Sequence, residues 1–444
     1  MPLKQKQKKV INNYHFLYYN KIGDSMTKED IIKLLETFTY SEIEINKILN
    51  SHEISSMKPN TVWNRIKENT EYLLSLGLSL KELKMMISLC PAIYGLSLSN
   101  LKDTINTLIE QGFKDEYLVM IKKNPQILES NIDTIKNTVS KIMKLGYTDN
   151  NQWISYHYTE KEAKKIFSSY PGLVGFEINT LNDKVSSLIE LGLEPKSVRT
   201  MILNWGIILS KNPASYMDKK KKFMEFGFTE PQALKIIKEN GSLLSRTEDV
   251  INNRSDFLMK LGYSKKGILR LLSSTPAILS FDNQNIENKI KNLMTYGYTI
   301  EQVIAMTLMH TPLLSYSIPR VNKRIEDLMN LGYEKNDVLN SIYKFPGLFG
   351  FSESTLKEKI LYLKEIGLGI ILMKSPKDLM QGIDLTYARI EFLKEKGIPQ
   401  TEEDYYLLFQ DNKYFTKRFH ITKEELIEKY SYQKYKESKN EPTF

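Results

Sequence analysis

The chain has 444 residues, of which 41% are hydrophobic and 26% are charged, and this composition supports a sizeable folded core and excludes wholesale disorder. Its 21 glycines and 15 prolines are too few for a collagen or a proline-rich linker protein, and its single cysteine, Cys90, excludes an intrachain disulfide and a cysteine-based zinc site. The formal net charge of +9 favours an anionic partner such as nucleic acid.

Residues 1–25 are predicted to be a basic N-terminal extension, in which no acidic residue precedes Asp24. Organelle transit peptides are poor in acidic residues, but they are also rich in arginine, and the chain has no arginine before Arg65. The apolar run at residues 366–373 is too short to span a bilayer. We therefore expect an intracellular protein without a membrane partner, and a cytoplasmic one if this arginine-free N-terminus is not a transit peptide.

Residues 26–70 are predicted to form N-terminal capping helices, and from residue 71 to residue 400 one sequence unit repeats. The segment Leu-Met-Lys-Leu-Gly-Tyr-Ser at 258–264 returns in similar form at 293–299 and 328–334, and most copies are 35 residues apart. Residues 401–444 lose the repeat and are predicted to form a C-terminal cap and a polar tail. The glycines that anchor the copies are Gly77, Gly112, Gly146, Gly192, Gly227, Gly262, Gly297, Gly332, Gly367 and Gly397.

Each unit is predicted to contain two helices. Apolar residues precede the glycine at steps of three and four, the glycine caps this first helix, and a Ser or Thr then begins the second helix. The second helix ends at a proline, as at Pro276, or at a glycine, as at Gly241. Because one unit cannot bury its apolar faces alone, the sequence predicts an all-α solenoid of about nine to ten stacked units.

The repeated string Leu-x-x-Leu-Gly-(Tyr/Leu)-(Ser/Thr), a second helix, Pro-x-(Ile/Leu)-(Leu/Phe) and then (Leu/Ile)-x-x-(Lys/Arg)-(Ile/Val)-x-x-Leu resembles the mitochondrial transcription termination factor (mTERF) family. The resemblance covers about residues 70–400. It implies a superhelix that binds double-stranded DNA along a basic concave surface, and it implies a mitochondrial location. Some relatives act instead on RNA or in ribosome assembly, so an RNA partner stays open. Pentatricopeptide and tetratricopeptide repeats explain the recurrent proline and the period less well.

A periodic basic column is the clearest candidate site. The column lies eight residues before the anchoring glycines, and equivalent positions of a solenoid project to one side, so we expect these cations to form a stripe that contacts phosphates. The alternative is that the column flanks the first helices and pairs with nearby acids such as Glu287 and Glu326. The column consists of Lys184, Lys219, Arg254, Lys289, Arg324 and Lys359, with Arg389 at the same offset in the last unit.

Two further features are candidates for nucleic-acid contact. Lys219, Lys220, Lys221 and Lys222 are consecutive, which suits a phosphate clamp but is also common in solvated helices. Residues 150–158 expand the third unit with aromatic side chains, which are expected either to pack on the neighbouring repeat or to stack on an unpaired base. Arg199, Arg270 and Arg320 are additional basic candidates.

The sequence offers little support for catalysis. The five histidines are scattered, and no phosphate-binding loop or nucleophile motif is present. We expect a monomeric, non-enzymatic protein that needs no metal or cofactor. Its predicted function is binding of double-stranded DNA in transcription termination or regulation, with RNA binding and a protein-binding scaffold as the alternatives.

Overall fold

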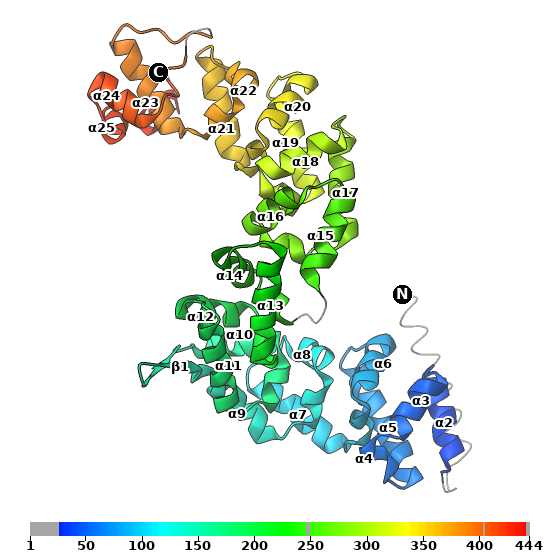
Figure 1. Cartoon of the computed structure of the whole chain (residues 1–444). Helices are drawn as coiled ribbons and strands as arrows, with labels where there is room; N and C mark the ends of the chain where they lie inside the picture. Colours follow the sequence, from blue (N-terminus) through cyan, green and yellow to red (C-terminus); the bar gives the residue numbers. More distant parts are fainter. Residues whose placement is uncertain (1–25, 246–248, 403–404, 441–444) are drawn as a thin grey trace. The chain divides into compact units, whose positions relative to one another are not determined.

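A computed structural model describes residues 26–245, 249–402 and 405–440 (Figure 1). Nearly all of these residues with regular structure are helical, and the sheet found among them is one two-stranded hairpin. The chain divides into two compact units, Met1–Glu248 and Asp249–Phe444. The predicted all-α repeat fold is confirmed, whereas the predicted extension at residues 1–25 lies outside the described residues.

In each repeat, a first helix and a second helix are followed by a short 3-10 turn. The N-terminal helices α2 (Lys28–Thr37), α3 (Glu42–Leu49) and α4 (His52–Ser55) lie where capping helices were predicted, and the first repeat begins with α5. The first helices of the first unit are α5 (Pro59–Ser75), α7 (Leu98–Glu110), α9 (Ile132–Met143), α11 (Ile178–Glu190) and α13 (Pro213–Phe226). The second helices are α6 (Leu80–Leu89), α8 (Tyr117–Lys123), α10 (Glu160–Ser169), α12 (Pro195–Asn204) and α14 (Glu230–Glu239). The turns are η1 (Pro91–Gly95), η2 (Pro125–Glu129), η3 (Pro171–Gly175), η4 (Gly206–Ser210) and η5 (Gly241–Ser245).

The second unit continues the same order. Its first helices are α15 (Val250–Lys260), α17 (Asn283–Met294), α19 (Ile318–Asn330), α21 (Glu353–Glu365) and α23 (Ile383–Glu395). Its second helices are α16 (Lys265–Ser274), α18 (Ile300–Met309), α20 (Lys335–Lys344) and the short α22 (Ile371–Lys374). Its turns are η6 (Pro276–Ser280), η7 (Thr311–Ser315), η8 (Pro346–Gly350) and η9 (Pro376–Met380).

Equivalent elements of successive repeats pack against one another. In the first unit α6, α8, α10, α12 and α14 contact each other in this order, and so do the turns η1 to η5. In Figure 1 the second helices α6, α8 and α10 of this unit lie above the first helices α5, α7 and α9. The stacking gives three layers, so a position on the second helices recurs along one layer of the unit.

The predicted glycine cap is present in almost every repeat. At the end of α15, Gly262 has a φ of 103°, its amide donates to Met259 O, and the amide of Tyr263 donates to Leu258 O. This is the hydrogen-bond pattern of a left-handed helix C-cap, and Tyr263, which follows the glycine, is buried. Gly146 is the exception, because it does not have a positive φ and lies in a strand.

The predicted anchor at Gly146 is therefore wrong, and His157 takes its place. His157 has a φ of 49° and precedes Gly192 by 35 residues, so the repeat resumes in register there. The inserted residues form the antiparallel strands β1 (Gly146–Asp149) and β2 (Gln152–Ser155). Asn150 and Asn151 connect the strands with φ values of 47° and 61°, as a tight type I′ turn requires.

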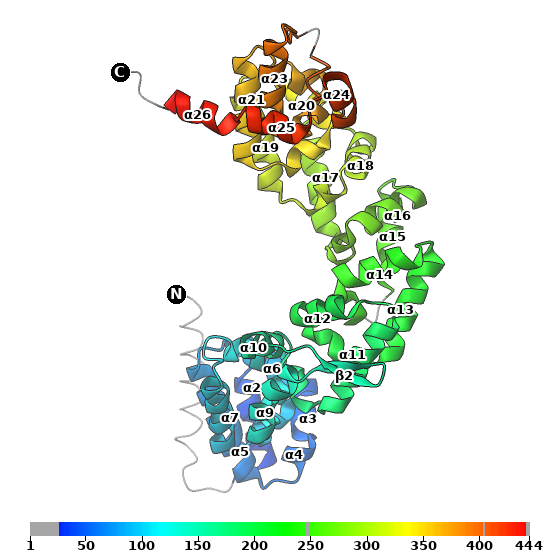
Figure 2. The same ribbon diagram turned by 90° about the vertical axis from the view of Figure 1, so that its left-hand side faces the viewer.

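The C-terminal cap consists of α24 (Asn412–Phe419) and α25 (Lys423–Lys429), whose Phe415 and Leu426 enter a core with Phe392 of α23. The last helix, α26 (Tyr432–Asn440), lies in the segment that was predicted to be a polar tail (Figure 2). Tyr435 packs edge-on against Tyr362 of α21, with ring centroids 5.9 Å apart. None of the helices in the described ranges is both long and apolar enough for a membrane span.

Candidate nucleic-acid interface

The predicted basic column lies mainly inside the repeat stack, which corrects the prediction of a solvent-facing stripe. A buried cation that already has a protein partner cannot reach a phosphate unless the repeats separate. The exposed fractions are 7% for Lys184 and Arg254, 6% for Arg324, 2% for Lys359 and 1% for Arg389, while Lys219 and Lys289 are partly buried.

The column is buried because its lysines bind backbone carbonyl groups of the following turn. Lys184 Nζ donates to Lys211 O over 2.7 Å, Lys289 Nζ to Leu314 O over 2.6 Å, and Lys359 Nζ to Leu379 O over 2.7 Å. The last carbonyls of a short helical turn have no donors within that turn, and a cation at this end is also favoured by the turn dipole. The period of 35 therefore reflects one hydrogen bond that recurs between the first helix and the next turn.

The arginines of the column serve the same purpose. Arg254 donates to Phe281 O and Arg324 to Phe351 O, at the ends of η6 and η8. Arg389 donates to Leu408 O over 3.0 Å and to Gln410 O over 2.6 Å, which connects the last first helix to the C-terminal cap. These contacts make the column a structural feature of the stack.

Burial changes the ionisation of the column. It lowers the pKa of Lys184 and Lys289, and it lowers the pKa of Lys359 to about 8. It also lowers the pKa of Arg389 to about 10. The ring of Phe176 lies 5.0 Å from Lys184 Nζ, so part of the lost hydration is replaced by a cation–π contact.

The consecutive lysines of α13 are mostly paired. Lys220 Nζ donates to Leu191 O over 2.9 Å and to Glu230 Oε1 over 2.8 Å. Lys221 lies 3.6 Å from Glu225 and Lys222 lies 3.3 Å from Asp218, both pairs within the helix. The acids therefore offset much of the charge expected for a phosphate clamp.

Exposed cations also lie on the second helices. α8 carries Lys122 and Lys123, α12 carries Lys196 and Arg199, and α16 carries three cations, and none of the three helices contains an acidic residue. By contrast, the first helix α11 carries only acidic residues apart from the buried Lys184. Acidic residues are thus absent from these three second helices, whereas α10 contains Glu160 and Glu162 and α14 contains Glu230 and Glu239.

Four lysines on three adjacent second helices form the surface that we call the basic ridge. Lys161 and Lys165 lie on α10, Lys196 on α12 and Lys238 on α14, and all four side chains are exposed. Within the described part of the chain, none of the four forms an ion pair with an acidic side chain. The ridge was missed although Lys161 and Lys196 are also 35 residues apart, because the column on the first helices is longer and more regular.

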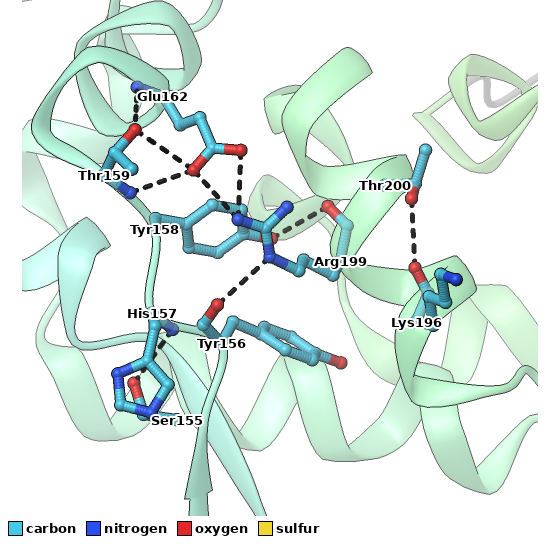
Figure 3. Close-up of polar contacts among 9 residues, drawn as sticks. All are labelled: Ser155, Tyr156, His157, Tyr158, Thr159, Glu162, Lys196, Arg199 and Thr200. Carbon is cyan, nitrogen blue, oxygen red and sulfur yellow. Dashed lines mark hydrogen bonds and ion pairs between the residues drawn. The ribbon is translucent and has the colours of Figure 1, made fainter.

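Arg199 connects two helices of the ridge, α10 and α12 (Figure 3). Its guanidinium group donates to both carboxylate oxygens of Glu162 over 3.0 and 2.9 Å, and its Nε donates to Tyr156 O over 3.0 Å. The guanidinium carbon lies 4.7 Å from the ring centroid of Tyr158, whose hydroxyl donates to Arg199 O. Arg199 therefore fixes α10, α12 and the base of the hairpin relative to one another. Its guanidinium group is already bound to protein groups and is not available to a phosphate.

The remaining candidates fall into two groups. Arg270 on α16 is exposed, whereas Arg320 donates to Phe349 O over 3.2 Å and lies 4.2 Å from the ring centroid of Tyr316. Cys90 is buried beside Glu129. Burial, and to a smaller extent the Glu129 carboxylate, raise the pKa of its thiol. No set of three His, Cys, Asp or Glu side chains within the described ranges is arranged to hold a metal ion.

Comparison with known proteins identifies one family. The model of the mTERF family matches residues 1–156 and 154–331, which together make up most of the chain. No curated protein matches the sequence. The matched ranges include all of the repeats of the first unit and the helices α15 to α19 of the second unit.

Proposed function

This chain belongs to the mTERF family, and we propose that it binds double-stranded DNA through the basic ridge and acts in transcription termination or regulation. The family is one of nucleic-acid-binding helical-repeat proteins. The single observation that carries the proposal is the ridge itself. It presents Lys161, Lys165, Lys196 and Lys238 on contacting helices of one unit, where they are exposed and form no ion pair with a described acidic residue.

The chemistry of the ridge favours backbone contact over base reading. Exposed lysines act as mobile point charges that suit phosphates, whereas bidentate recognition of bases usually needs arginine. The chain has few arginines, and Arg199, Arg254, Arg324 and Arg389 are occupied by protein partners. Sequence preference would then come mainly from the shape of the duplex.

Replacing the ridge lysines tests the proposal. We expect K161Q/K165Q/K196Q/K238Q to reduce the steepness of the log Kd against log salt plot by about 3 to 4, from about 0.9 per phosphate contact. Affinity should fall most at low salt, because counterion release drives this binding. Titration of a labelled duplex over a range of salt concentrations, with helicity checked by circular dichroism, measures both quantities.

A matched control keeps the net charge equal. Lys58, Lys102, Lys114 and Lys136 are exposed in the first unit but lie outside the second helices that carry the ridge. The variant K58Q/K102Q/K114Q/K136Q should therefore lose much less of the salt dependence. Equal loss in the two variants would show that net charge, and not the ridge, determines binding.

The nature of the nucleic acid needs its own experiment. Duplex RNA has an A-form geometry with a narrow major groove, so a surface suited to B-form DNA discriminates between the two. We expect duplex DNA to displace labelled duplex RNA at equal salt more readily than the reverse. Family members are generally organellar, and the mitochondrial location and the absence of enzymatic activity stay predictions.

A further inference from the structure

The hairpin β1–β2 exposes large apolar side chains that folding does not explain. Trp153 keeps 52% of its surface exposed and Ile154 keeps 37%, although they occupy neighbouring positions of a short strand. The hairpin is well defined, because its strands pair along their whole length and its two-residue turn has left-handed asparagines. An exposed indole on a rigid support is typical of a binding surface.

Gly146 allows the indole of Trp153 to lie along the hairpin. A Cβ atom at Gly146 would clash with the backbone oxygen of Ile154 and would stand 2.7 Å from Cζ2 of Trp153, so neither the opposite strand nor the indole leaves room for a side chain there. Gly146 is also freed from the cap function, since His157 provides the left-handed residue of this repeat. The glycine thus leaves room for the tryptophan ring beside the strand.

Trp153 forms one wall of a hollow of about 560 Å³ between α9, the hairpin and α11. Met143 and Ile178 add apolar surface, and Lys144, His157 and Asn182 add polar groups. The residues that line the hollow include no aspartate or glutamate. The neighbouring hollow between α8, α10 and α12 differs in this respect, because Glu116, Glu160 and Glu162 line it.

The polar groups of the hollow are mainly donors. Asn182 Oδ1 accepts a hydrogen bond from the amide of Gly146 over 3.2 Å, and its amide nitrogen makes no hydrogen bond to any described residue. Lys144 is exposed and has no acidic partner among the described residues. The hollow therefore combines a flat aromatic wall, an amide donor and a cation, which suits a planar ligand that carries a phosphate.

The hollow is rigidly connected to the basic ridge. Tyr158 lines the hollow, and its ring lies against Arg199 of α12, the helix that also carries Lys196 (Figure 3). Arg199 also binds Tyr156 O at the base of the hairpin and Glu162 of α10. The contacts of Arg199 thus join the hollow and the helices α10 and α12 of the ridge within the same unit.

We infer that the hollow beside Trp153 receives one unpaired base of a bound nucleic-acid strand. The base stacks on the indole, Asn182 donates to its edge, and Lys144 contacts the adjoining phosphate. This inference rests on the proposed nucleic-acid binding and adds a preference for strands with an unpaired nucleotide. Because every base has a π-face, the site tolerates different bases.

The test compares two duplexes of equal sequence, one perfect and one with a single bulged nucleotide replaced by a fluorescent adenine analogue. Stacking on an aromatic side chain contributes about 1 to 3 kcal/mol per base, so we expect the full chain to bind the bulged duplex about 5- to 150-fold more tightly. Binding should also quench the analogue. Trp153→Ala should remove both effects and leave the affinity for the perfect duplex unchanged, and Trp153→Phe should retain part of them.

Ile154→Ala is the matched control, since Ile154 is exposed on the same strand but does not line the hollow. A preference that survives in Trp153→Ala, or that is lost equally in Ile154→Ala, would overturn the inference. So would a wild-type protein that binds both duplexes equally with normal salt dependence, and the proposed function would then stand. If the wild-type protein binds neither duplex, the proposed function fails and the inference fails with it.

Discussion

The ammonium group of Lys184 donates a 2.7 Å hydrogen bond to the carbonyl oxygen of Lys211, which ends the turn of the same repeat, 27 residues further along the chain. The same contact recurs in the second unit, where Lys289 and Lys359 and, as arginines, Arg254 and Arg324 make it. It satisfies carbonyl groups that the short 3-10 turns leave without donors. Periodic cations in this fold therefore connect the first helix to the turn, and the exposed cations of the second helices remain available to a partner.

Replacing Lys184 separates these two roles. Lys184→Met keeps the aliphatic stem but removes the donor to Lys211 O, so we expect the free energy of unfolding to fall by about 1 to 3 kcal/mol. The salt dependence of DNA binding should not change, because Lys184 does not reach the surface. Urea unfolding and duplex titration measure the two effects. Lys196→Met serves as the control and should give the opposite pattern.

Lys359 should make stability depend on pH in an unusual direction. Its pKa is about 8 in the folded protein, whereas an ordinary lysine, as in the unfolded chain, has a pKa of 10.5. Between these two pH values the unfolded chain therefore binds more protons than the folded protein. The free energy of unfolding should therefore rise by about 1 to 3 kcal/mol from pH 8 to pH 10.5, and this rise should be absent in Lys359→Met. Urea unfolding of both proteins at pH 7.5 and pH 10 isolates the effect. A stability difference between the two proteins that is independent of pH would contradict the prediction.

The pair of Arg199 and Glu162 should be coupled modestly. Both side chains are partly exposed, so a double-mutant cycle should give about 1 kcal/mol rather than the value of a buried pair. Glu162→Gln is preferred to Glu162→Ala, because Glu162 also accepts from the amide of Thr159 at the start of α10, and glutamine keeps an acceptor there. Arg199→Met completes the cycle. A coupling energy near zero would mean that the pair does not hold α10 to α12.

The fold could be predicted because its signals are local. The glycine caps, the apolar steps and the helix-ending prolines each lie within one unit. The basic column was wrongly predicted to be exposed, because the prediction used its 35-residue period and not its position relative to the apolar residues of the same helix. Leu181, Lys184, Val185 and Leu188 follow the i, i+3, i+4, i+7 pattern of a buried stripe, and Leu356, Lys359, Ile360 and Leu363 repeat it. That pattern was a sequence signal for burial.

The hairpin was harder to predict. Its strands are four residues long, and their pairing depends on the register between Thr148 and Trp153. The pair Asn150-Asn151 was a turn signal, since asparagine tolerates a positive φ. The lining of the hollow depends on how α9 and α11 pack against the hairpin. No local sequence pattern predicts this packing.

The left-handed caps give a final prediction that isolates backbone conformation from packing. Gly77 has a φ of 101°, Gly175 does not have a positive φ, and a Cβ atom at either position would meet nothing within 4 Å. Gly77→Ala should therefore cost about 1 kcal/mol through its backbone alone. Gly175→Ala should be neutral or should stabilise by up to about 1 kcal/mol, because alanine restricts the unfolded chain. Both glycines belong to the first unit, so one urea transition of that unit compares them. Equal effects would show that the conformation of Gly77 is not required to end α5.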